Sequence, residues 1–480
     1  MLHKNTKIVC TLGPASNNPK ILEKMIRAGM NVARLNFSHG TYDEYAKMIT
    51  MIRAVSKKLK TPIAILQDLQ GPKIRIGEMP KDGIAIKKGE VVILSTAHKS
   101  YATEKGQKKT TKKPTKIFPV QFKDLHKDVG ARDTILIEDG LIELTVSQVK
   151  GRSIFCRAET DAVIQAHKGI NVPTASLSAD PLTSKDLKDL AFGLKHDVDY
   201  VALSFVRQAS DVIRLKKLIN AKHSSAKVMA KIERHEAVKN LEEIIEASDA
   251  VMVARGDLGV EIPAENVPIV QKRTILLANI YGKPVITATQ MLNSMIENPR
   301  ATRAEISDAA NAVFDHSDAL MLSNETAVGK YPIEAVETLA KVAHATEENL
   351  QKYEHLLPFK KDIFEMKTSN ATCLNAVKLA LDIKADAIVA VSLSGYTAQH
   401  IAKHRIYTPI ITITTSEKVR NQLALVWGLN DILVKKINFK RAGQDVTKLL
   451  LKSHMVKKGQ EIVTVVNASK DENFITTTSA

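Results

Sequence analysis

The sequence predicts an α/β protein of three domains: a (β/α)8 TIM barrel, a small β-barrel domain inserted into it, and a C-terminal open α/β domain. Eight short runs of apolar, often β-branched residues alternate with amphipathic helical patterns, which is the element count of a (β/α)8 barrel. Segments of alternating apolar and polar residues separate the third run from the fourth, and further strands and helices follow the eighth. With 480 residues, the chain is too long for one compact unit.

The barrel strands are expected as nearly continuous apolar runs, because parallel strands in such barrels are covered on both faces. These runs are residues 7–13, 32–37, 63–69, 200–205, 228–233, 250–256, 284–290 and 319–325. The clearest helical patterns between them are residues 20–30, 186–195, 211–221, 235–247 and 267–281. Two helices are expected to begin with a capping box, at Thr41 with Glu44 and at Thr302 with Glu305.

The other two domains follow from changes in this pattern. Residues 71–168 are expected to form the inserted domain, because their apolar residues alternate with polar ones and glycine-containing turns separate the segments. The barrel would then comprise residues 1–70 and 169–345. Residues 346–480 are expected to form the open α/β domain, since apolar runs again alternate with helical stretches. Those runs are residues 387–391, 409–414, 431–434 and 461–466.

Composition limits the classes of function. The net charge of +17 attracts anions, so nucleic acids and multiply phosphorylated metabolites are both candidate partners. The densest basic run, residues 105–116, has no aromatic residues to stack on bases, so we interpret it as a solvated loop and expect no nucleic-acid partner. No apolar stretch reaches the roughly 18 residues of a membrane span. With no signal peptide and no CxxC pair, we expect a cytoplasmic protein that contacts no membrane.

Polar residues follow nearly every predicted barrel strand. Catalytic groups of such barrels lie at this C-terminal end of the strands. A single polar residue there is common in any fold, whereas a ring of them around one mouth indicates an active site. In strand order these residues are Arg34, Asn36, Ser38 and His39, then Asp68, Lys231, Glu233, Arg255, Asp257, Thr289, Gln290, Ser323 and Glu325.

Lys231 and Glu233 are two residues apart on one strand and therefore point to the same face. A buried ion pair is the simplest interpretation. Alternatively, Glu233 and Asp257 could share a divalent cation, because Mg²⁺ is often held by one or two carboxylates and substrate phosphates. The carboxylates could also act as general bases, but nearby cations should lower their pKa values, so we favour a metal site for phosphoryl transfer. The sequence contains neither GxxxxGK[ST] nor GxGxxG, which argues against a P-loop enzyme or a protein kinase.

Seven strings of the sequence form a recognisable set. They are TKIVCTLGPAS (6–16), ARLNFSHG (33–40), DLQGPKIR (68–75), KIE (231–233), MVARGDLGVE (252–261), TATQMLNSM (287–295) and MLSNET (321–326). In content and order they resemble the pyruvate kinase family, and the resemblance covers essentially the whole chain. It implies a homotetrameric glycolytic enzyme that transfers the phosphoryl group of phosphoenolpyruvate to ADP, giving pyruvate and ATP. The alternative is a metal-dependent lyase or aldolase that acts through a pyruvate enolate.

The resemblance also implies roles for the residues at the barrel mouth. Lys231 would neutralise the phosphoryl group in transfer and Arg34 would bind it. Thr289, with Ser323 nearby, would lie on the proton route to the enolate, through water because neither hydroxyl is acidic enough alone. The helix-start amides at 255–257 suit the carboxylate of the substrate. The expected contacts of phosphoenolpyruvate are Arg34, Lys231, Arg255, Gly256, Asp257 and Thr289.

The metal and the nucleotide are assigned in the same way. Glu233 and Asp257 would hold Mg²⁺ or Mn²⁺, and a second magnesium ion would arrive with ADP. The inserted domain would close over the mouth as a lid and exclude water. The expected contacts of the nucleotide phosphates are Arg75 and Lys185, helped by Asn36 and His39.

One departure from the family concerns potassium. Many relatives bind a monovalent cation with residues that match Asn36, Ser38, Asp68 and the carbonyl of Leu69. Members that require potassium typically contain GPEIR, whereas this chain has Lys73 in GPKIR. Because an ammonium group can supply the positive charge of a bound potassium ion, we expect activity without added K⁺.

A second departure concerns regulation. Residues 392–397 (SLSGYT) follow a predicted strand and begin a helix, as in a phosphate-binding nest, although an ordinary strand–helix turn has the same pattern. They match the family's loop for sugar-phosphate effectors, with Leu393 and Tyr396 where bisphosphate-activated members carry basic residues. The tail at 470–480 also lacks an arginine. We therefore expect a sugar monophosphate or AMP as the effector, bound by Ser392, Ser394, Gly395 and Thr397.

Overall fold

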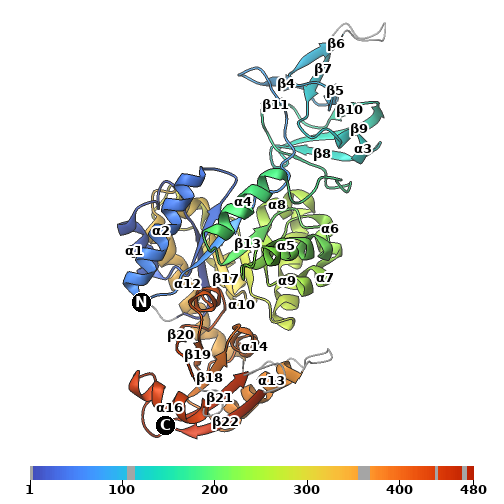
Figure 1. Ribbon diagram of the computed structural model, residues 1–480. Coiled ribbons are helices and arrows are strands. Elements are labelled where there is room, and N and C mark those ends of the chain that lie inside the picture. The colour runs from blue at the N-terminus through green and yellow to red at the C-terminus, as the bar shows by residue number, and fades with distance from the viewer. Residues whose placement is uncertain (1–3, 105–113, 355–367, 438–441, 468–472) are drawn as a thin grey trace.

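The computed structural model describes residues 4–104, 114–354, 368–437, 442–467 and 473–480. Three parts of the chain lie one above another in Figure 1: the inserted β domain at the top, the barrel in the middle and the C-terminal domain below. Most of the basic run at 105–116, which we interpret as a solvated loop, lies outside the described residues. None of the helices in the described part is both long and apolar enough to traverse a bilayer.

The barrel predicted from the sequence is confirmed. Eight parallel strands close on themselves in the order β1-β17-β16-β15-β14-β13-β3-β2. Each strand ends just before its predicted end, because the polar residues there already belong to loops or to the next helix. The strands are β1 (Lys7–Thr11), β2 (Val32–Asn36), β3 (Ala64–Asp68), β13 (Tyr200–Leu203), β14 (Lys227–Ile232), β15 (Ala250–Ala254), β16 (Val285–Ala288) and β17 (Ala319–Leu322).

Helices surround this barrel, as the amphipathic patterns predict. The capping boxes at Thr41 and Thr302 are confirmed, and a third, at Thr183 with Asp186, was not predicted. The helices are α1 (Pro19–Ala28), α2 (Tyr42–Leu59), α4 (Ser184–Lys195), α5 (Ala209–Ala221), α6 (His235–Lys239), α7 (Leu241–Ala247), α8 (Arg255–Glu261), α9 (Val267–Ile280), α10 (Arg303–Phe314), α11 (Asn324–Ala327) and α12 (Pro332–Glu354), with two 3-10 turns, η1 (Ala264–Asn266) and η2 (Asn293–Ile296).

The prediction of one helix over 235–247 was wrong, because Asn240 separates α6 from α7. Its backbone, at φ −100° and ψ 25°, leaves the helical region. Its side-chain Nδ2 donates to the carbonyl oxygen of Arg207 at 2.9 Å. Asparagine forms such side-chain-to-backbone bonds readily, at the expense of a continuous helix.

Within the described residues, the inserted domain is entirely β apart from the short α3 (Leu125–Asp128), and its own apolar core includes Phe118, Leu144 and Ile154. The expected small barrel is not closed among the described residues. Seven strands form one sheet in the order β12-β8-β9-β10-β5-β7-β6, while β11 and β4 pair with each other. Because β12 belongs to this sheet, the domain extends to Asn171, past the predicted end at residue 168. The strands are β4 (Ile84–Ile86), β5 (Val91–Ser95), β6 (Ala102–Glu104), β7 (Thr115–Pro119), β8 (Thr134–Ile137), β9 (Ile142–Lys150), β10 (Ser153–Ala158), β11 (Ala162–Ile164) and β12 (Ile170–Asn171).

The C-terminal domain is an open α/β sheet, as predicted. Its strand order is β20-β19-β18-β21-β22, with β22 antiparallel to β21 and the others parallel. The edge strand β22 was not predicted, because its Thr-rich sequence contains no apolar run. The elements are α13 (Thr368–Asp382), β18 (Ala387–Ser392), α14 (Tyr396–Ala402), β19 (Ile410–Thr414), α15 (Glu417–Leu423), β20 (Asp431–Val434), α16 (Ala442–Lys452), β21 (Glu461–Asn467) and β22 (Asn473–Ser479).

The C-terminal domain closes the end of the barrel opposite the inserted domain. Ala424 and Leu425 pack into the apolar cluster that fills the barrel interior. Buried Arg405 forms an ion pair of 2.8 Å with Asp318, which directly precedes β17, and its guanidinium lies 5.2 Å from the ring centroid of Trp427. The functional mouth must therefore lie at the other end of the barrel, where the strands finish and the inserted domain begins.

Candidate active site

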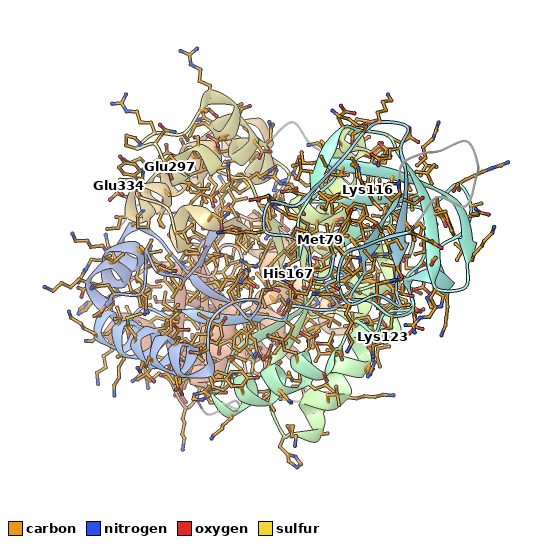
Figure 2. The ribbon with its side chains drawn as sticks, turned by 90° about the horizontal axis from the view of Figure 1, so that it is seen from above. Met79, Lys116, Lys123, His167, Glu297 and Glu334 are labelled. Carbon is orange, nitrogen blue, oxygen red and sulfur yellow. The ribbon has the colours of Figure 1, made fainter. Side chains whose placement is uncertain are left out.

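The inserted domain joins the barrel through two connections that run side by side. The backbone N–H of Ile76 donates to the carbonyl of Lys168 at 2.9 Å, and that of Ile170 donates to Ile74 at 2.8 Å. In the view from above, the domain lies over one side of the molecule, with Lys116 and Lys123 far from Glu297 and Glu334 of the barrel (Figure 2). The paired connections define a hinge region next to the barrel mouth.

Lys231 lies at the centre of a buried polar cluster at this mouth. Its Nζ is 3.0 Å from Glu233 Oε2 and 3.6 Å from Asp68 Oδ1, and it donates to Ser204 Oγ at 2.8 Å. Arg34, on the strand next to that of Asp68, donates from Nε to Asp68 Oδ2 at 2.7 Å. Arg34, Asp68, Lys231 and Glu233 were all predicted to lie at the mouth, whereas Ser204 was not. The sequence also gave no sign that Asp68 would bridge the two cations.

The charges of this cluster hold one another in place. Burial lowers the pKa of Lys231, but the carboxylates of Asp68, Glu233 and Asp257 outweigh that effect, so the pKa lies above its ordinary value. Burial works against the charge of Asp68 as well, yet Lys231 and Arg34 hold its pKa below the usual range. The ammonium group is therefore permanently charged at neutral pH.

Glu233 corrects one expectation from the sequence. We expected the surrounding cations to lower its pKa, but burial raises the pKa of Glu233, and the charge of Asp257 adds to this effect against the opposing influence of Lys231. The side chain is almost fully buried. A further positive charge would therefore stabilise its carboxylate form.

The donor set fits a divalent cation. Glu233 Oε2 is buried, and its ion pair with Lys231 is its one contact to a polar group of the described residues. The strands β14 and β15 are neighbours, with Ile232 opposite Val253, so Glu233 and Asp257 follow adjacent strand ends. Asp257 is exposed in the first turn of α8 and acts electrostatically on both Lys231 and Glu233. Carboxylate oxygens of this kind are the ligands that Mg²⁺ prefers.

Thr289 and the start of α8 form one unit. The Gly256 N–H donates to Thr289 Oγ1 at 2.8 Å, and this hydroxyl donates to the carbonyl of Ala288 at 2.6 Å. The Arg255 guanidinium holds the same loop, through the carbonyl of Thr289 at 2.7 Å and Asp308 at 2.8 Å. Thr289 has a φ of 72°, which is strained for a β-branched residue and typical of functional sites. The Arg255 side chain therefore positions this loop.

Ser323 lies at the end of β17, beside this unit in the barrel order. It is half-buried, and its N–H donates to Glu325 Oε2 at 2.7 Å. Glu325 Oε1 accepts from the N–H of Leu292, beyond β16. Glu325 thus connects the loops that carry Thr289 and Ser323.

The predicted nucleotide residues share one electrostatic environment. Burial lowers the pKa of His39, and the positive charges of Lys73, Arg75 and Lys185 lower it further. Lys185 Nζ donates to the carbonyl of Phe37 and to Asp189, both at 2.6 Å. Arg75 donates to the carbonyl of His167 at 2.9 Å, within the hinge. These basic groups form an anion-attracting patch beside the Lys231 cluster.

The residues predicted to bind a monovalent cation already form hydrogen bonds within the protein. Asn36 Oδ1 accepts from the N–H of Ser38 at 3.2 Å, and the carbonyl of Leu69 accepts from Ser204 Oγ at 2.8 Å. Asp68 bonds Arg34 and lies beside Lys231. The pKa of Lys73 is lowered because its amino group is partly shielded from water and because Arg75 lies nearby. The charge of Asp257 acts in the opposite direction. The positive charge of Lys73 is therefore felt at the predicted metal site.

A second polar cluster was missed by the sequence interpretation. Arg234 is almost completely buried and donates to Glu236 Oε1 at 3.1 Å and to Glu261 Oε1 at 3.3 Å. His235 Nδ1 lies 3.3 Å from Glu261 Oε2. The groups of His235, Glu236 and Glu261 are close enough to hold a metal ion, but the guanidinium already lies between the two carboxylates. We interpret this cluster as an ion-pair network.

The predicted effector loop follows β18. Gly395 has a φ of 82°, and Ser394 Oγ accepts from the N–H of Tyr396 at 3.4 Å. Ser392 and Thr397 are buried, and no residue in the described part of the chain hydrogen-bonds Thr397 Oγ1. Most of the tail at 470–480 forms β22, against β21.

Comparisons with known proteins identify the fold. The family model "Pyruvate kinase, barrel domain" matches residues 3–336, and "Pyruvate kinase, alpha/beta domain" matches residues 370–477. A protein named pyruvate kinase from Staphylococcus epidermidis is 45% identical over 90% of this chain and 72% of its own length. One from Clostridium acetobutylicum is 42% identical over 90% of this chain and 89% of its length.

A solved structure agrees with these matches. The pyruvate kinase from Cryptosporidium parvum has a TM-score of 0.88 and 32% sequence identity, and the match covers 99% of this chain and 96% of that one. The two family models together span both ends of the molecule, and the relatives match nearly all of it. The chain belongs to the pyruvate kinase family of phosphotransferases.

Proposed function

We propose that this chain transfers the phosphoryl group of phosphoenolpyruvate to ADP and releases pyruvate and ATP. The observation that carries the proposal is the buried Lys231 ammonium, 3.0 Å from Glu233 and 3.6 Å from Asp68, at the mouth of a (β/α)8 barrel. Phosphoryl transfer requires positive charge fixed where the three equatorial oxygens of the moving group pass. Lys231 supplies that charge, and Asp68 holds both Lys231 and Arg34 towards the site.

Glu233 and Asp257 would hold Mg²⁺ or Mn²⁺ in this proposal. When bound, such an ion ties substrate oxygens to the enzyme and neutralises developing negative charge. Glu233 is held in position by the N–H of Phe205, which donates to its Oε1 at 2.6 Å. Its other oxygen faces the Lys231 ammonium at 3.0 Å. Pyruvate kinases in general need a divalent metal, and this pair of carboxylates fits that need.

Thr289 and Ser323 would carry the proton that converts the enolate to pyruvate. The Thr289 hydroxyl donates to the carbonyl of Ala288, so its proton is not free for direct donation. A water molecule held between Thr289 and Ser323 would deliver the proton instead. The substrate carboxylate would lie at the start of α8, where Gly256 and Asp257 present the backbone.

The nucleotide would lie on the basic patch of His39, Lys73, Arg75 and Lys185, with Asn36 nearby. Arg75 donates to the carbonyl of His167 in the hinge, so the basic patch lies next to the inserted domain. The inserted domain would close over the bound substrates as a lid and exclude water from the reaction. We further propose a homotetramer, as the resemblance implies.

The test is the formation of pyruvate from phosphoenolpyruvate and Mg²⁺, measured with and without ADP. A kinase forms pyruvate only with ADP and produces one ATP for each pyruvate. A lyase or aldolase that acts through a pyruvate enolate has no acceptor for the phosphoryl group and would form no pyruvate from phosphoenolpyruvate under either condition. That result would overturn the proposal, and so would equal rates with and without ADP, because the phosphoryl group would then pass to water. The relatives described above are named pyruvate kinases, which favours the first outcome.

Activity without potassium is expected because Lys73 places a positive charge near Asp257 and Glu233. The rate in buffer free of Na⁺ and K⁺ should equal the rate with K⁺ added. Lys73→Glu should make the enzyme dependent on K⁺, while Lys81→Glu, an exposed lysine further along the inserted domain, should not. A strict requirement for K⁺ in the unmodified chain would contradict this prediction.

Activation by a sugar monophosphate or AMP is expected at residues 392–397. Thr397 Oγ1 is buried and has no hydrogen-bond partner among the described residues, and Gly395 takes the left-handed conformation found in anion-binding nests. Glucose 6-phosphate or AMP should lower the concentration of phosphoenolpyruvate that gives half-maximal rate, and Thr397→Val should reduce this effect. If only fructose 1,6-bisphosphate lowers that concentration, the prediction is wrong.

A further inference from the structure

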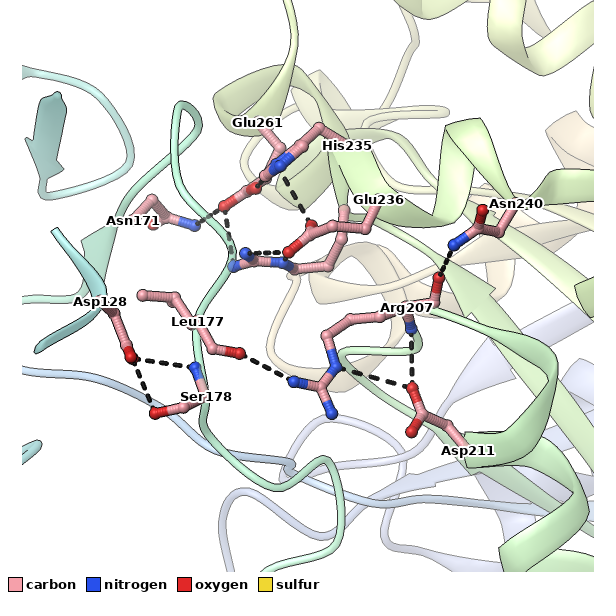
Figure 3. Close-up of polar contacts among 11 residues, drawn as sticks. Asp128, Asn171, Leu177, Ser178, Arg207, Asp211, His235, Glu236, Asn240 and Glu261 are labelled. Carbon is pink, nitrogen blue, oxygen red and sulfur yellow. Dashed lines mark hydrogen bonds and ion pairs between the residues drawn. The ribbon is translucent and has the colours of Figure 1, made fainter. Parts of the chain in front are cut away.

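The inserted domain contacts the barrel through the helix that carries Asp257. Asn171, at the end of β12, donates from Nδ2 to Glu261 Oε1 at 3.0 Å, and Glu261 is the last residue of α8 (Figure 3). The turn at Gly140 also faces this helix, since a β-carbon at Gly140 would lie 3.9 Å from Val260 Cγ1. One contact comes from β12 and the other from the turn between β8 and β9, so two separate parts of the inserted domain face α8.

Glu261 is held from the barrel side by Arg234. The same oxygen that accepts from Asn171 accepts from Arg234 Nη1 at 3.3 Å. Arg234 directly follows Glu233, and its guanidinium lies 5.7 Å from the ring centroid of Phe205, whose N–H bonds Glu233. The Arg234–Glu261 pair therefore links the loop that carries Glu233 to the helix that carries Asp257.

The connection that returns from the inserted domain has its own anchors. Asp128 of α3 accepts from the N–H and the hydroxyl of Ser178, and the carbonyl of Leu177 accepts from Arg207 Nη1 at 2.8 Å (Figure 3). Arg207 in turn faces Asp211 of α5. These anchors keep the connection attached to the barrel, so loss of the Asn171 contact should change the docking of the domain without detaching it.

We propose that Glu261 is a positioning residue that couples the docking of the inserted domain, through Asn171, to the placement of Asp257 opposite Glu233. This inference rests on the proposed function, because it concerns the metal site and the lid of that reaction. When the inserted domain is docked, Asn171 fixes the position of Glu261 at the end of α8. Arg234, which also bonds Glu261, then fixes the loop after β14 that carries Glu233. Docking of the domain over the nucleotide and the correct placement of the two metal ligands therefore favour each other.

The test uses a new carboxylate at the contact. Asn171→Asp places a negative charge against Glu261 and should favour the undocked state. Only molecules with a docked inserted domain would bind ADP and Mg²⁺ well, so the apparent affinity falls in proportion to the docked fraction. The KM for ADP and the Mg²⁺ concentration for half-maximal rate should each rise about tenfold, with little change in kcat at saturation. Asn171→Ala, which removes the donor without adding charge, should show the same changes in weaker form.

The matched control is Gln148→Asp, which adds the same charge to an exposed position of β9. It lies six positions after Ile142 on β9, which puts it about 20 Å along the strand from the turn at Gly140. The double variant Asn171→Asp with Glu261→Gln restores a donor–acceptor pair in the opposite direction and the original net charge. It should recover most of the loss caused by Asn171→Asp alone.

Hydrogen exchange of the amides at 256–261 gives a readout that does not depend on activity. These amides should exchange faster in Asn171→Asp than in the unmodified chain or in Gln148→Asp, and the double variant should restore their protection. If Asn171→Asp matches Gln148→Asp in exchange and kinetics, or if the double variant is no better than Asn171→Asp, the coupling is wrong. Absence of ADP-dependent pyruvate formation in the unmodified chain would overturn the proposed function alone, since the exchange experiment would still test the coupling.

Discussion

Replacement of Lys231 by methionine is expected to lower kcat by about three orders of magnitude. The ammonium group is buried between Asp68 and Glu233, where its charge is worth far more than in water, and it acts mainly when negative charge shifts in the transition state. The KM for phosphoenolpyruvate should change much less than kcat, because the metal and Arg34 still bind the ground state. Steady-state rates of pyruvate formation measure both quantities.

The matched control is Lys227→Met on the same strand. Lys227 begins β14 at the far end of the barrel, and burial lowers its pKa as well, so the substitution removes a comparable amine far from the mouth. This variant should keep nearly all of its activity. A Lys231→Met enzyme with a kcat within tenfold of the unmodified one would contradict the assigned role, provided that its thermal unfolding is cooperative and near that of the control.

Loss of either predicted metal ligand is expected to have the second largest effect. Asp257→Asn and Glu233→Gln should each lower kcat/KM by about 10²- to 10³-fold and raise the Mg²⁺ concentration for half-maximal rate. The Glu233 variant should also be more stable without metal, because it removes a buried carboxylate whose pKa is already raised by burial. Magnesium titrations of activity and thermal unfolding check both statements.

Glu265→Gln is the control for these two variants. Glu265 lies in η1, shortly after α8, and its side chain is exposed. Its replacement removes one negative charge from the same region without touching the mouth. An equal loss of magnesium affinity in Glu265→Gln would show that total charge, and not ligation by Glu233 and Asp257, sets the response.

The barrel could be predicted because strands buried on both faces appear in the sequence as nearly continuous apolar runs, without the alternation of one-sided strands. The run at 250–256, for example, is apolar from Ala250 to Ala254, and the polar residues Arg255 and Asp257 follow. The end of each strand is therefore visible in the sequence, and with it the ring of mouth residues. The resemblance to a family then assigned roles to residues such as Thr289 and Arg75 that periodicity alone could not distinguish.

Contacts between distant segments could not be predicted in this way. The Ser204 hydroxyl donates to the carbonyl of Leu69 because β13 pairs with β3 across the whole inserted domain, and no local sequence pattern reports that pairing. The Arg234–Glu261 pair depends likewise on where α8 ends relative to the loop after β14. The pKa of Glu233 was predicted in the wrong direction, because its sign depends on burial, which only the folded structure provides.

The claim that Glu233 and Asp257 together bind the divalent cation is tested most directly by a crystal structure of the protein with phosphoenolpyruvate and Mn²⁺, measured at a wavelength where manganese scatters anomalously. We expect one anomalous peak within about 2.2 Å of a carboxylate oxygen of Glu233 and of one of Asp257, with the phosphoryl group beside Lys231. A manganese ion bound elsewhere, for example among His235, Glu236 and Glu261, with Glu233 still paired only to Lys231, would contradict it.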